Sequence, residues 1–269
     1  MKEKLHRIQV YGRVYKTLLR LNVTKLFAYR ANFINSAIAH TIWAAFGVIS
    51  MLLLTSKVAT VYGWTPNELM LLAGTYNLIL SFFYFFFSRN FGDLADVIHF
   101  GKLDTFLLKP IDTQFLISSW NVGYTQLIRF VIGFGVVWYF LVHMGTSLTF
   151  VSLVQFMLLL CASVIILYSF WMLVLTLLLW FTNVSNLVDL LYQINGITRF
   201  PSEIYKGFGM ILFFVLFPLT LIVVSPTKAL LQQMTWQEML VPIGFAIGMG
   251  FLCRRFWQFA LRFYTSASG

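Results

Sequence analysis

Charged residues are scarce in this chain: only 10% of its 269 residues are Asp, Glu, Lys or Arg. Soluble domains carry about 25%. The rest is unusually apolar, with 59% hydrophobic and 18% aromatic residues. A soluble fold could not cover so much apolar surface, whereas a bilayer accepts it at every lipid-facing position. The composition therefore excludes an ordinary soluble domain and predicts an integral membrane protein.

Chemical motifs are also missing. The two cysteines, Cys161 and Cys253, lack C-x-x-C or metal-ligand spacing, which excludes a disulfide framework and a zinc site. No G-x-x-x-x-G-K-[ST] run, H-E-x-x-H helix or G-x-S-x-G turn occurs. The chain is therefore expected to be no enzyme and to bind no cofactor.

Basic residues outnumber acidic ones by 19 to 9, and many of them lie before residue 31. Such a juxtamembrane segment is explained by membrane orientation and by anionic lipid headgroups, so we expect no nucleic-acid partner. Its apolar residues are too dispersed for a cleaved signal peptide.

Six stretches are apolar and long enough to cross a hydrocarbon core of about 30 Å as helices. They lie near 32–56, 66–88, 124–142, 150–181, 207–224 and 238–256. An even count places both termini on one side, and all Lys and Arg except Lys57 and Lys228 then fall on that side. Because cytoplasmic loops retain Lys and Arg, we expect cytoplasmic termini. The polar segment 183–206 is interpreted as a cytoplasmic or partly inserted connection.

The fold prediction is an all-α polytopic protein with about six transmembrane helices. Residues 1–30 would form an N-terminal interfacial region and residues 31–269 the transmembrane domain. On a helical wheel, one face of the N-terminal region is apolar: Val10, Tyr11, Val14, Tyr15, Leu18 and Leu21. Arg13, Lys16 and Arg20 form the opposite, basic face, as in helices that lie along a leaflet. A simple orientation signal explains the same pattern.

The loop between the second and third spans, residues 90–112, predicts a short docking helix. Asn90 is expected to cap it, with Asp93 at the third helical position, and Gly101 to end it. The expected apolar stripe is Phe91, Leu94, Ala95 and Ile98, while Asp93 and Asp96 face outward; the remaining docking candidates are His99 and Phe100. After it, Pro110 forces a turn and Asp112 is expected to cap the next helix. A passive surface helix is the alternative.

Several spans carry isolated polar or small residues. Polar positions at membrane depth usually face protein or a water-filled path; they are His40, Asn77, Gln155 and Ser169. Arg129 is expected to reach lipid headgroups or to pair with a carboxylate. Gly244, Gly248 and Gly250 form a ridge that lets two helices approach closely, within one subunit or between two.

Short motifs throughout the chain resemble one branch of the ABC-2 family of permeases. They are Tyr29-Arg30-Ala31-Asn32-Phe33, Leu71-Leu72-Ala73-Gly74-Thr75, Gly101-Lys102-Leu103-Asp104, Leu107-Leu108-Lys109-Pro110, Arg199-Phe200-Pro201 and Ser225-Pro226. The resemblance implies a membrane subunit that pairs with an identical or homologous permease and rests on a dimer of ABC ATPase subunits. It places the coupling helix at residues 90–100, shaped by Gly101, Leu103, Asp104, Lys109 and Pro110, and an interfacial helix at residues 10–21.

One feature departs from the wider family, in which a Pro-containing motif follows the fifth span on the outer face. Here Pro201 precedes a full apolar stretch. Either residues 187–204 insert and 207–224 re-enters, or the simple six-span count holds and Pro201 is cytoplasmic. Both readings leave the C-terminus cytoplasmic.

The resulting functional hypothesis is the permease subunit of an ATP-driven exporter in a bacterial plasma membrane. It would move a hydrophobic or amphipathic substrate by alternating access. The alternative is an ion-coupled secondary transporter or another polytopic protein without an ATPase partner. Secondary transporters normally show buried ionisable residues and internal repeats, and neither is visible here.

Overall fold

The protein is described by a computed structural model covering residues 2–56, 60–181, 186–201 and 210–264. Within these ranges it contains helices and no strand, which confirms the all-α prediction. The long helices are α1 (Lys2–Ala28), α2 (Arg30–Thr55), α3 (Pro66–Phe83), α7 (Gln126–His143), α8 (Phe150–Thr176), α10 (Met210–Leu230) and α11 (Trp236–Ala260). The short ones are α4 (Arg89–His99), α5 (Asp104–Leu107), α6 (Thr113–Ser119) and α9 (Leu187–Ile197).

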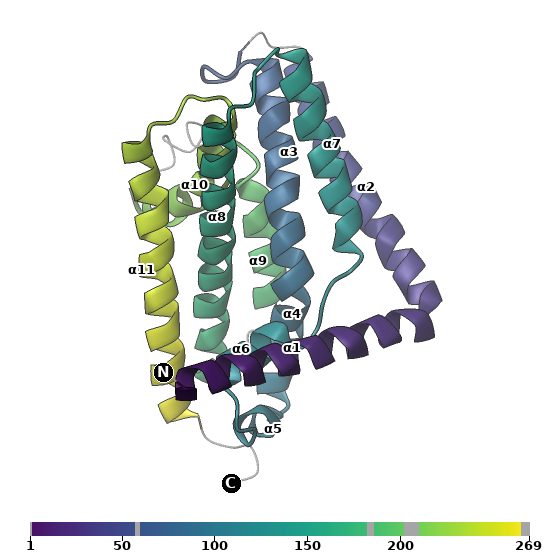
Figure 1. Ribbon diagram of the computed structural model, residues 1–269, viewed down its shortest axis with the longest axis vertical. Helices are drawn as coiled ribbons and strands as arrows, with labels where there is room; N and C mark the ends of the chain where they lie inside the picture. The colour runs from purple at the N-terminus through teal and green to yellow at the C-terminus, as the bar shows by residue number, and fades with distance from the viewer. Residues whose placement is uncertain (1, 57–59, 182–185, 202–209, 265–269) are drawn as a thin grey trace.

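Five helical stretches in the described residues are long and apolar enough to cross a membrane, so the protein is a multi-pass membrane protein. They are Arg30–Thr55, Pro66–His99, Gln126–His143, Phe150–Leu179 and Trp236–Phe263. Each overlaps one of the stretches expected from hydropathy. Both termini lie at one end of the bundle, where α1 runs across the ends of the other helices (Figure 1).

Local sequence signals explain several helix ends at the opposite end of the bundle. Thr65 and Glu68 form a reciprocal capping box at the start of α3, and Thr235 and Glu238 form another at the start of α11. Gly145 adopts φ +63° just after α7, in the left-handed conformation that favours glycine. These caps satisfy backbone groups that the helices themselves leave unpaired.

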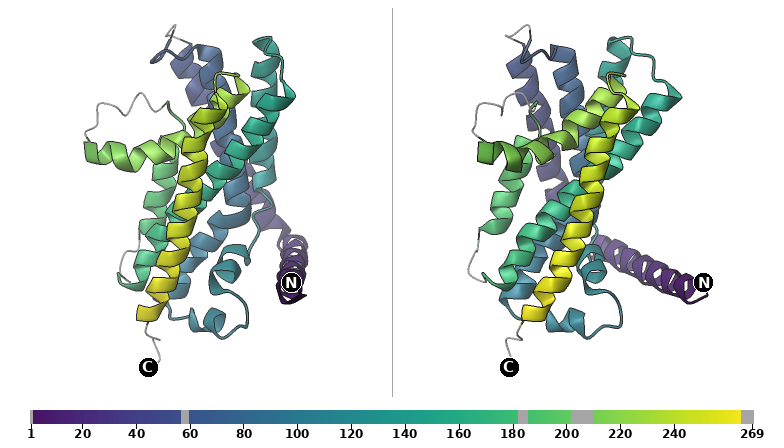
Figure 2. Two further views of the ribbon diagram at one scale, coloured as in Figure 1. Left: turned by 60° about the vertical axis from the view of Figure 1, so that its left-hand side comes forward. Right: turned by 90° about the vertical axis from the view of Figure 1, so that its left-hand side faces the viewer.

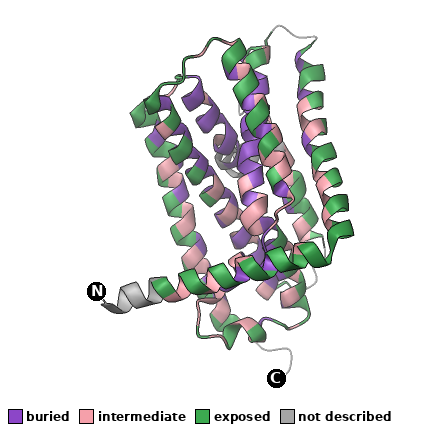
Figure 3. Cartoon of the chain, turned by 45° about the vertical axis from the view of Figure 1, so that its right-hand side comes forward, coloured by how far each residue is buried: buried purple, intermediate pink, exposed green. Residues whose placement is uncertain are grey.

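The centre of the bundle is α3, which is buried while α1 and α2 are largely exposed (Figure 3). In the most apolar 18-residue stretch of Pro66–His99, 78% of the residues are buried. The corresponding share for Arg30–Thr55 is 11%. Helix α7 packs closely on α3, because Gly74 and Gly133 leave room where side chains would collide. By contrast, Gly244 and Gly248 on α11 have no atom within 4 Å of an added Cβ. At Gly250, the third position of the expected ridge, an added Cβ would lie 3.7 Å from Ile165 Cγ2 on α8, so only this position of the ridge contacts another helix within the described part of the subunit.

Between α8 and α11 the described chain contains two α-helices, α9 and α10. Helix α9 packs inside the bundle: Trp171 Nε1 on α8 donates to Asn195 Oδ1 at 3.2 Å. In Figure 2 the first part of α10 lies across the bundle, and its last residues reach the end opposite α1, where Lys228 lies 5.9 Å from the Trp64 ring centroid. Helix α9 lies within the expected 187–204 segment, and its placement in the membrane stays a prediction. The ends of the polar segment, 183–185 and 202–206, and the start of the expected 207–224 span lie outside the described residues.

The second span does not end before the docking segment. A π-helical turn, Tyr84–Ser88, joins α3 directly to α4, so helical structure runs without interruption from Pro66 to His99. The prediction that Asn90 caps a separate helix is therefore wrong. A π-turn adds one residue to a helical turn, and periodicity and caps gave no sign of it.

Candidate functional site

Helix α4 ends where the sequence predicted. Gly101 has φ +63°; its N–H donates to Ile98 O at 3.1 Å, and Lys102 N–H donates to Val97 O at 2.8 Å. This pair of bonds is a Schellman motif, which needs a left-handed residue directly after the helix. The chain is thereby turned sharply into the short α5 at the end of the bundle.

The apolar stripe of α4 faces the protein rather than a partner. Phe91, Leu94 and Ile98 are 0%, 1% and 6% exposed, and Ala95 is partly buried. Phe91 packs against the rings of Tyr168 and Trp171 on α8. The interpretation of this stripe as a docking surface is therefore corrected: it joins α4 to the bundle. Periodicity identified an apolar face but not what covers it.

The opposite face of α4 is exposed at Asp93, Asp96 and His99, and Phe100 follows with 63% exposure. Beyond Gly101, Leu103 is fully buried and anchors the turn. Helix α5 begins at Asp104, and Leu107, Leu108 and Pro110 are exposed at or after its end. We call Phe100, Leu107 and Leu108 the apolar tip; Leu108 is 85% exposed.

Asn90 holds α4 to the segment that follows the tip. Its Nδ2 donates to Ser118 O at 2.8 Å and to Asn121 O at 2.9 Å, while its Oδ1 accepts from Asn121 N at 2.6 Å. Asn121 Nδ2 donates in turn to Asp93 Oδ2 at 2.8 Å. A buried amide with these partners fixes two backbone segments relative to each other.

Lys109 completes the tip. Its Nζ lies 4.1 Å from the Trp120 ring centroid and 5.2 Å from that of Phe106. Cation–π contacts of this kind fix a side chain without a carboxylate partner. The tip is therefore held from both sides, at Leu103 and at Lys109.

Helix α1 lies beneath the same end of the bundle. Arg13, Lys16 and Arg20 are exposed, on the side away from buried Leu18. Two hydrogen bonds connect α1 to residues near α6: Asp112 N donates to Tyr11 Oη at 3.2 Å, and Asn22 Nδ2 donates to Trp120 O at 3.0 Å. An orientation signal alone would need neither contact.

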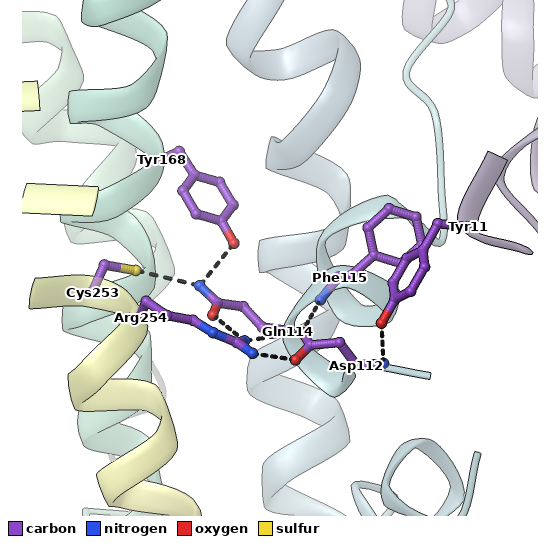
Figure 4. A network of polar contacts seen from close by, with 7 residues as sticks. All are labelled: Tyr11, Asp112, Gln114, Phe115, Tyr168, Cys253 and Arg254. Carbon is purple, nitrogen blue, oxygen red and sulfur yellow. Dashed lines mark hydrogen bonds and ion pairs between the residues drawn. The ribbon is translucent and has the colours of Figure 1, made fainter. Parts of the chain in front are cut away.

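A polar network links α1, α6, α8 and α11 (Figure 4). Arg254 on α11 forms an ion pair with Asp112 and donates to Gln114 Oε1 at 2.9 Å. Gln114 Nε2 donates to Tyr168 Oη at 3.1 Å. Asp112 also caps α6, as expected, because its Oδ1 accepts from Phe115 N at 3.0 Å.

The environment of Asp112 favours its charged form. Partial burial raises its pKa, but the hydrogen bonds from Arg254 and Phe115, together with the Arg254 charge, outweigh burial and lower the pKa below its ordinary value. The ion pair therefore forms throughout the neutral range. Its side chains are 30% and 41% exposed, so its contribution to stability is modest.

Sequence reasoning missed the partners that hold the segment in place: Gln114, Asn121, Tyr168 and Arg254. Asn121 and Gln114 are buried polar residues beside a cap, which is a detectable signal. The pairing of Arg254 with Asp112 joins residues 142 positions apart and gives no local signal.

The described residues contain no group of three or more His, Cys, Asp or Glu side chains that could hold a metal ion. The hydrogen bonds and the ion pair described at this end connect helices to one another.

The chain matches one protein family, whereas no curated protein and no solved structure matches it. The family described as "ABC-2 family transporter protein" matches residues 41–268, which include five long helices, the tip and the Asp112–Arg254 network. The chain therefore belongs to the ABC-2 family of transporter proteins.

Proposed function

We propose that this chain is the permease subunit of an ATP-driven exporter and that the tip beyond α4 contacts the ATPase. The observation that carries the proposal is the unbroken helical run from Pro66 to His99, which ends in an exposed apolar tip. Exposed Leu108 and Phe100 at a polar end of a membrane protein are typical of a surface that a partner covers.

The tip is built to move as a rigid unit with the bundle. The buried stripe of α4 joins it to α8, Asn90 joins it to the chain beyond α6, and the Asp112–Arg254 pair joins that chain to α11. Closure of an ATPase dimer would displace the tip, and these contacts would transmit the displacement to α3, α8 and α11. Such rigid-body movement is what alternating access requires.

The remaining parts of the proposal follow from the family. ATP and Mg²⁺ would bind the ATPase subunits, and a second permease, identical or homologous, would complete the pathway. The end that carries α1 and both termini would be cytoplasmic, in a bacterial plasma membrane. The exposed basic residues Arg13, Lys16 and Arg20 would then face anionic headgroups.

The experiment is co-purification of ATPase subunits with the tagged chain from its native membrane. The test variant is Leu108→Asp, which charges the most exposed residue of the tip. The matched control is Leu148→Asp, a 42% exposed leucine in the loop at the opposite end of the bundle. Size-exclusion chromatography in detergent checks that both variants fold.

We expect the wild type and Leu148→Asp to retain the ATPase and Leu108→Asp to lose most of it. Retention by Leu108→Asp would remove the tip from the interface while leaving the permease assignment in place. If no ATPase co-purifies with wild type, the ion-coupled secondary transporter becomes the better reading.

A further inference from the structure

Two half-buried arginines, Arg129 and Arg199, lie beside Tyr76 and Asn77 of the central helix α3. Arg129 is in the first turn of α7, and its Nε donates to Asn77 Oδ1 on α3 at 3.0 Å. Its guanidinium carbon lies 5.3 Å and 5.9 Å from the ring centroids of Tyr84 and Tyr76. It pairs with no carboxylate of the described ranges, so that expected role is wrong.

Arg199 approaches the same place from the end of α9. It lines a cavity of about 100 Å³ between α2 and α3, together with Ser50, Met51, Tyr76, Asn77 and Phe200. Its Nε is buried and has no hydrogen-bond partner in the part of the chain that the structure describes. An unpaired buried guanidinium N–H costs free energy, which a polar partner in the cavity would recover.

The cavity lies at membrane depth. Ser50 is five residues from the end of α2, and Asn77 is eleven residues from the start of α3, which places them about 8 Å and about 16 Å from those helix ends. Glu68 and Glu238 lie at the N-terminal caps of α3 and α11, and Asp189 lies in the first turn of α9, the opposite end of that helix from Arg199. Arg129 lies 5.9 Å from the Tyr76 ring centroid, and Arg199 lines the cavity together with Tyr76. Two cations in a low-dielectric interior repel each other and attract an anion.

We propose that this cavity is a subsite for the anionic group, a carboxylate or a phosphate, of an amphipathic cargo. Arg199 would donate hydrogen bonds to the anion, and Arg129, one hydrogen bond away through Asn77, would add the second charge. Met51 and Phe200 would contact the apolar part. A water needs about 10–15 Å³ of such space, so the cavity has room for a small anionic group but not for a whole amphiphile. This inference rests on the proposed function, which supplies the cargo.

The test is equilibrium binding of radiolabelled dodecyl phosphate to the purified chain in phosphatidylcholine nanodiscs. Unlabelled laurate should compete, whereas dodecanol, which has no charge, and inorganic phosphate, which has no apolar chain, should not. Arg199→Gln should weaken binding by about tenfold to a hundredfold, the range for hydrogen bonds to charged groups. Arg199→Lys should lose less than the glutamine variant, and Arg262→Gln, at an exposed arginine after α11, should bind as wild type does.

Equal competition by dodecanol, or unchanged binding by Arg199→Gln, would overturn the subsite. If Arg199→Gln does not fold, Ser50→Leu tests the same cavity by placing an apolar side chain in its wall, and wild-type affinity in that variant would likewise refute the proposal. Glu203, which lies outside the described residues, is the candidate for an internal counter-ion. We expect Glu203→Gln to bind the probe as wild type does. If only this variant bound the probe, the Glu203 carboxylate would be the natural partner of Arg199, and the proposal would be wrong.

Two further arms identify the source of the anion and separate the two proposals. Loss of labelled probe when phosphatidylglycerol replaces phosphatidylcholine would assign the subsite to an anionic lipid headgroup; unchanged binding would assign it to a single-chain amphiphile. The binding assay contains no ATPase and no ATP, so its failure leaves the co-purification result intact. Absence of an ATPase in the co-purification would refute the proposed ATP-driven transport, whatever the binding assay shows.

Discussion

The close approach of α7 to α3 provides a sharp test of the packing. A Cβ added at Gly133 on α7 would lie 2.9 Å from Leu78 N, 3.0 Å from Asn77 Cβ and 3.0 Å from Gly74 O on α3. Ordinary carbon contacts lie at about 3.5–4.0 Å. In Gly133→Ala, α7 would therefore have to move away from α3 by roughly 0.5 to 1 Å, and backbone atoms cannot yield as a side chain would.

The magnitude follows from two opposed effects. Forcing an extra methyl group into a packed interface costs about 1–3 kcal/mol. Replacing glycine by alanine within a helix returns about 0.5–1 kcal/mol. We therefore expect Gly133→Ala to lower the free energy of unfolding by about 1–2 kcal/mol. The control is Gly135→Ala on the same helix, where an added Cβ meets nothing within 4 Å; it should be neutral or stabilising by up to about 1 kcal/mol.

The assay is reversible unfolding in detergent, or thermal inactivation of monodisperse protein by fluorescence-detected chromatography where unfolding is irreversible. The prediction covers both the size of the loss in unfolding free energy and the order of the variants, with Gly133→Ala less stable than Gly135→Ala. If Gly133→Ala is as stable as Gly135→Ala, the α3–α7 approach described here is wrong. The same result would remove the argument that membrane helices without a hydrophobic drive associate here through small residues.

Three further predictions concern the end that carries the tip. Leu94→Asp should reduce the yield of folded protein severely, because it places a charge at a 1% exposed position, whereas Leu108→Asp should not, and detergent chromatography measures both. Asn90→Leu should lower stability by about 1–3 kcal/mol through unpaired backbone groups of the next segment, as measured by thermal unfolding. The pKa of Asp112 is lowered on folding, so its stabilisation is present above its unfolded value of 3.8 and is lost as the pH falls through the folded value. Asp112→Asn should therefore cost under about 1 kcal/mol at pH 7, since its pair with Arg254 is partly exposed, and the difference from wild type should vanish in acid unfolding curves.

Much of the fold could be predicted because its signals are local. Hydropathy located five of the spans, three of them within two residues at both ends, since burial in lipid requires long apolar runs; the helices that begin near residues 66 and 236 extend further than expected, to His99 and Phe263. Gly101 and Asp112 were identified as a helix stop and a helix cap because both roles depend on the residue's own backbone and side chain. The membership in the ABC-2 family followed from short motifs that the family comparison supports.

The docking stripe was misassigned for a physical reason. Periodicity at Phe91, Leu94 and Ile98 shows that one face of α4 is apolar, but protein, lipid and a partner subunit all select apolar residues. Only the packing on α8 shows that the bundle itself covers this face. Likewise, the π-turn at Tyr84–Ser88 left no break in the apolar run, so a continuous helix and two separate ones gave the same pattern.

The sequence by itself determined the membrane class, the spans, the side on which the basic residues gather and the family, because each depends on composition or on neighbours along the chain. The tertiary structure decided which apolar face is free, that Arg254 pairs with Asp112, and that Arg129 and Arg199 meet beside Tyr76. These facts depend on how helices distant in the sequence approach each other. That approach is set by small residues, hydrogen bonds and cavities distributed over several helices, and no single segment of the chain encodes it.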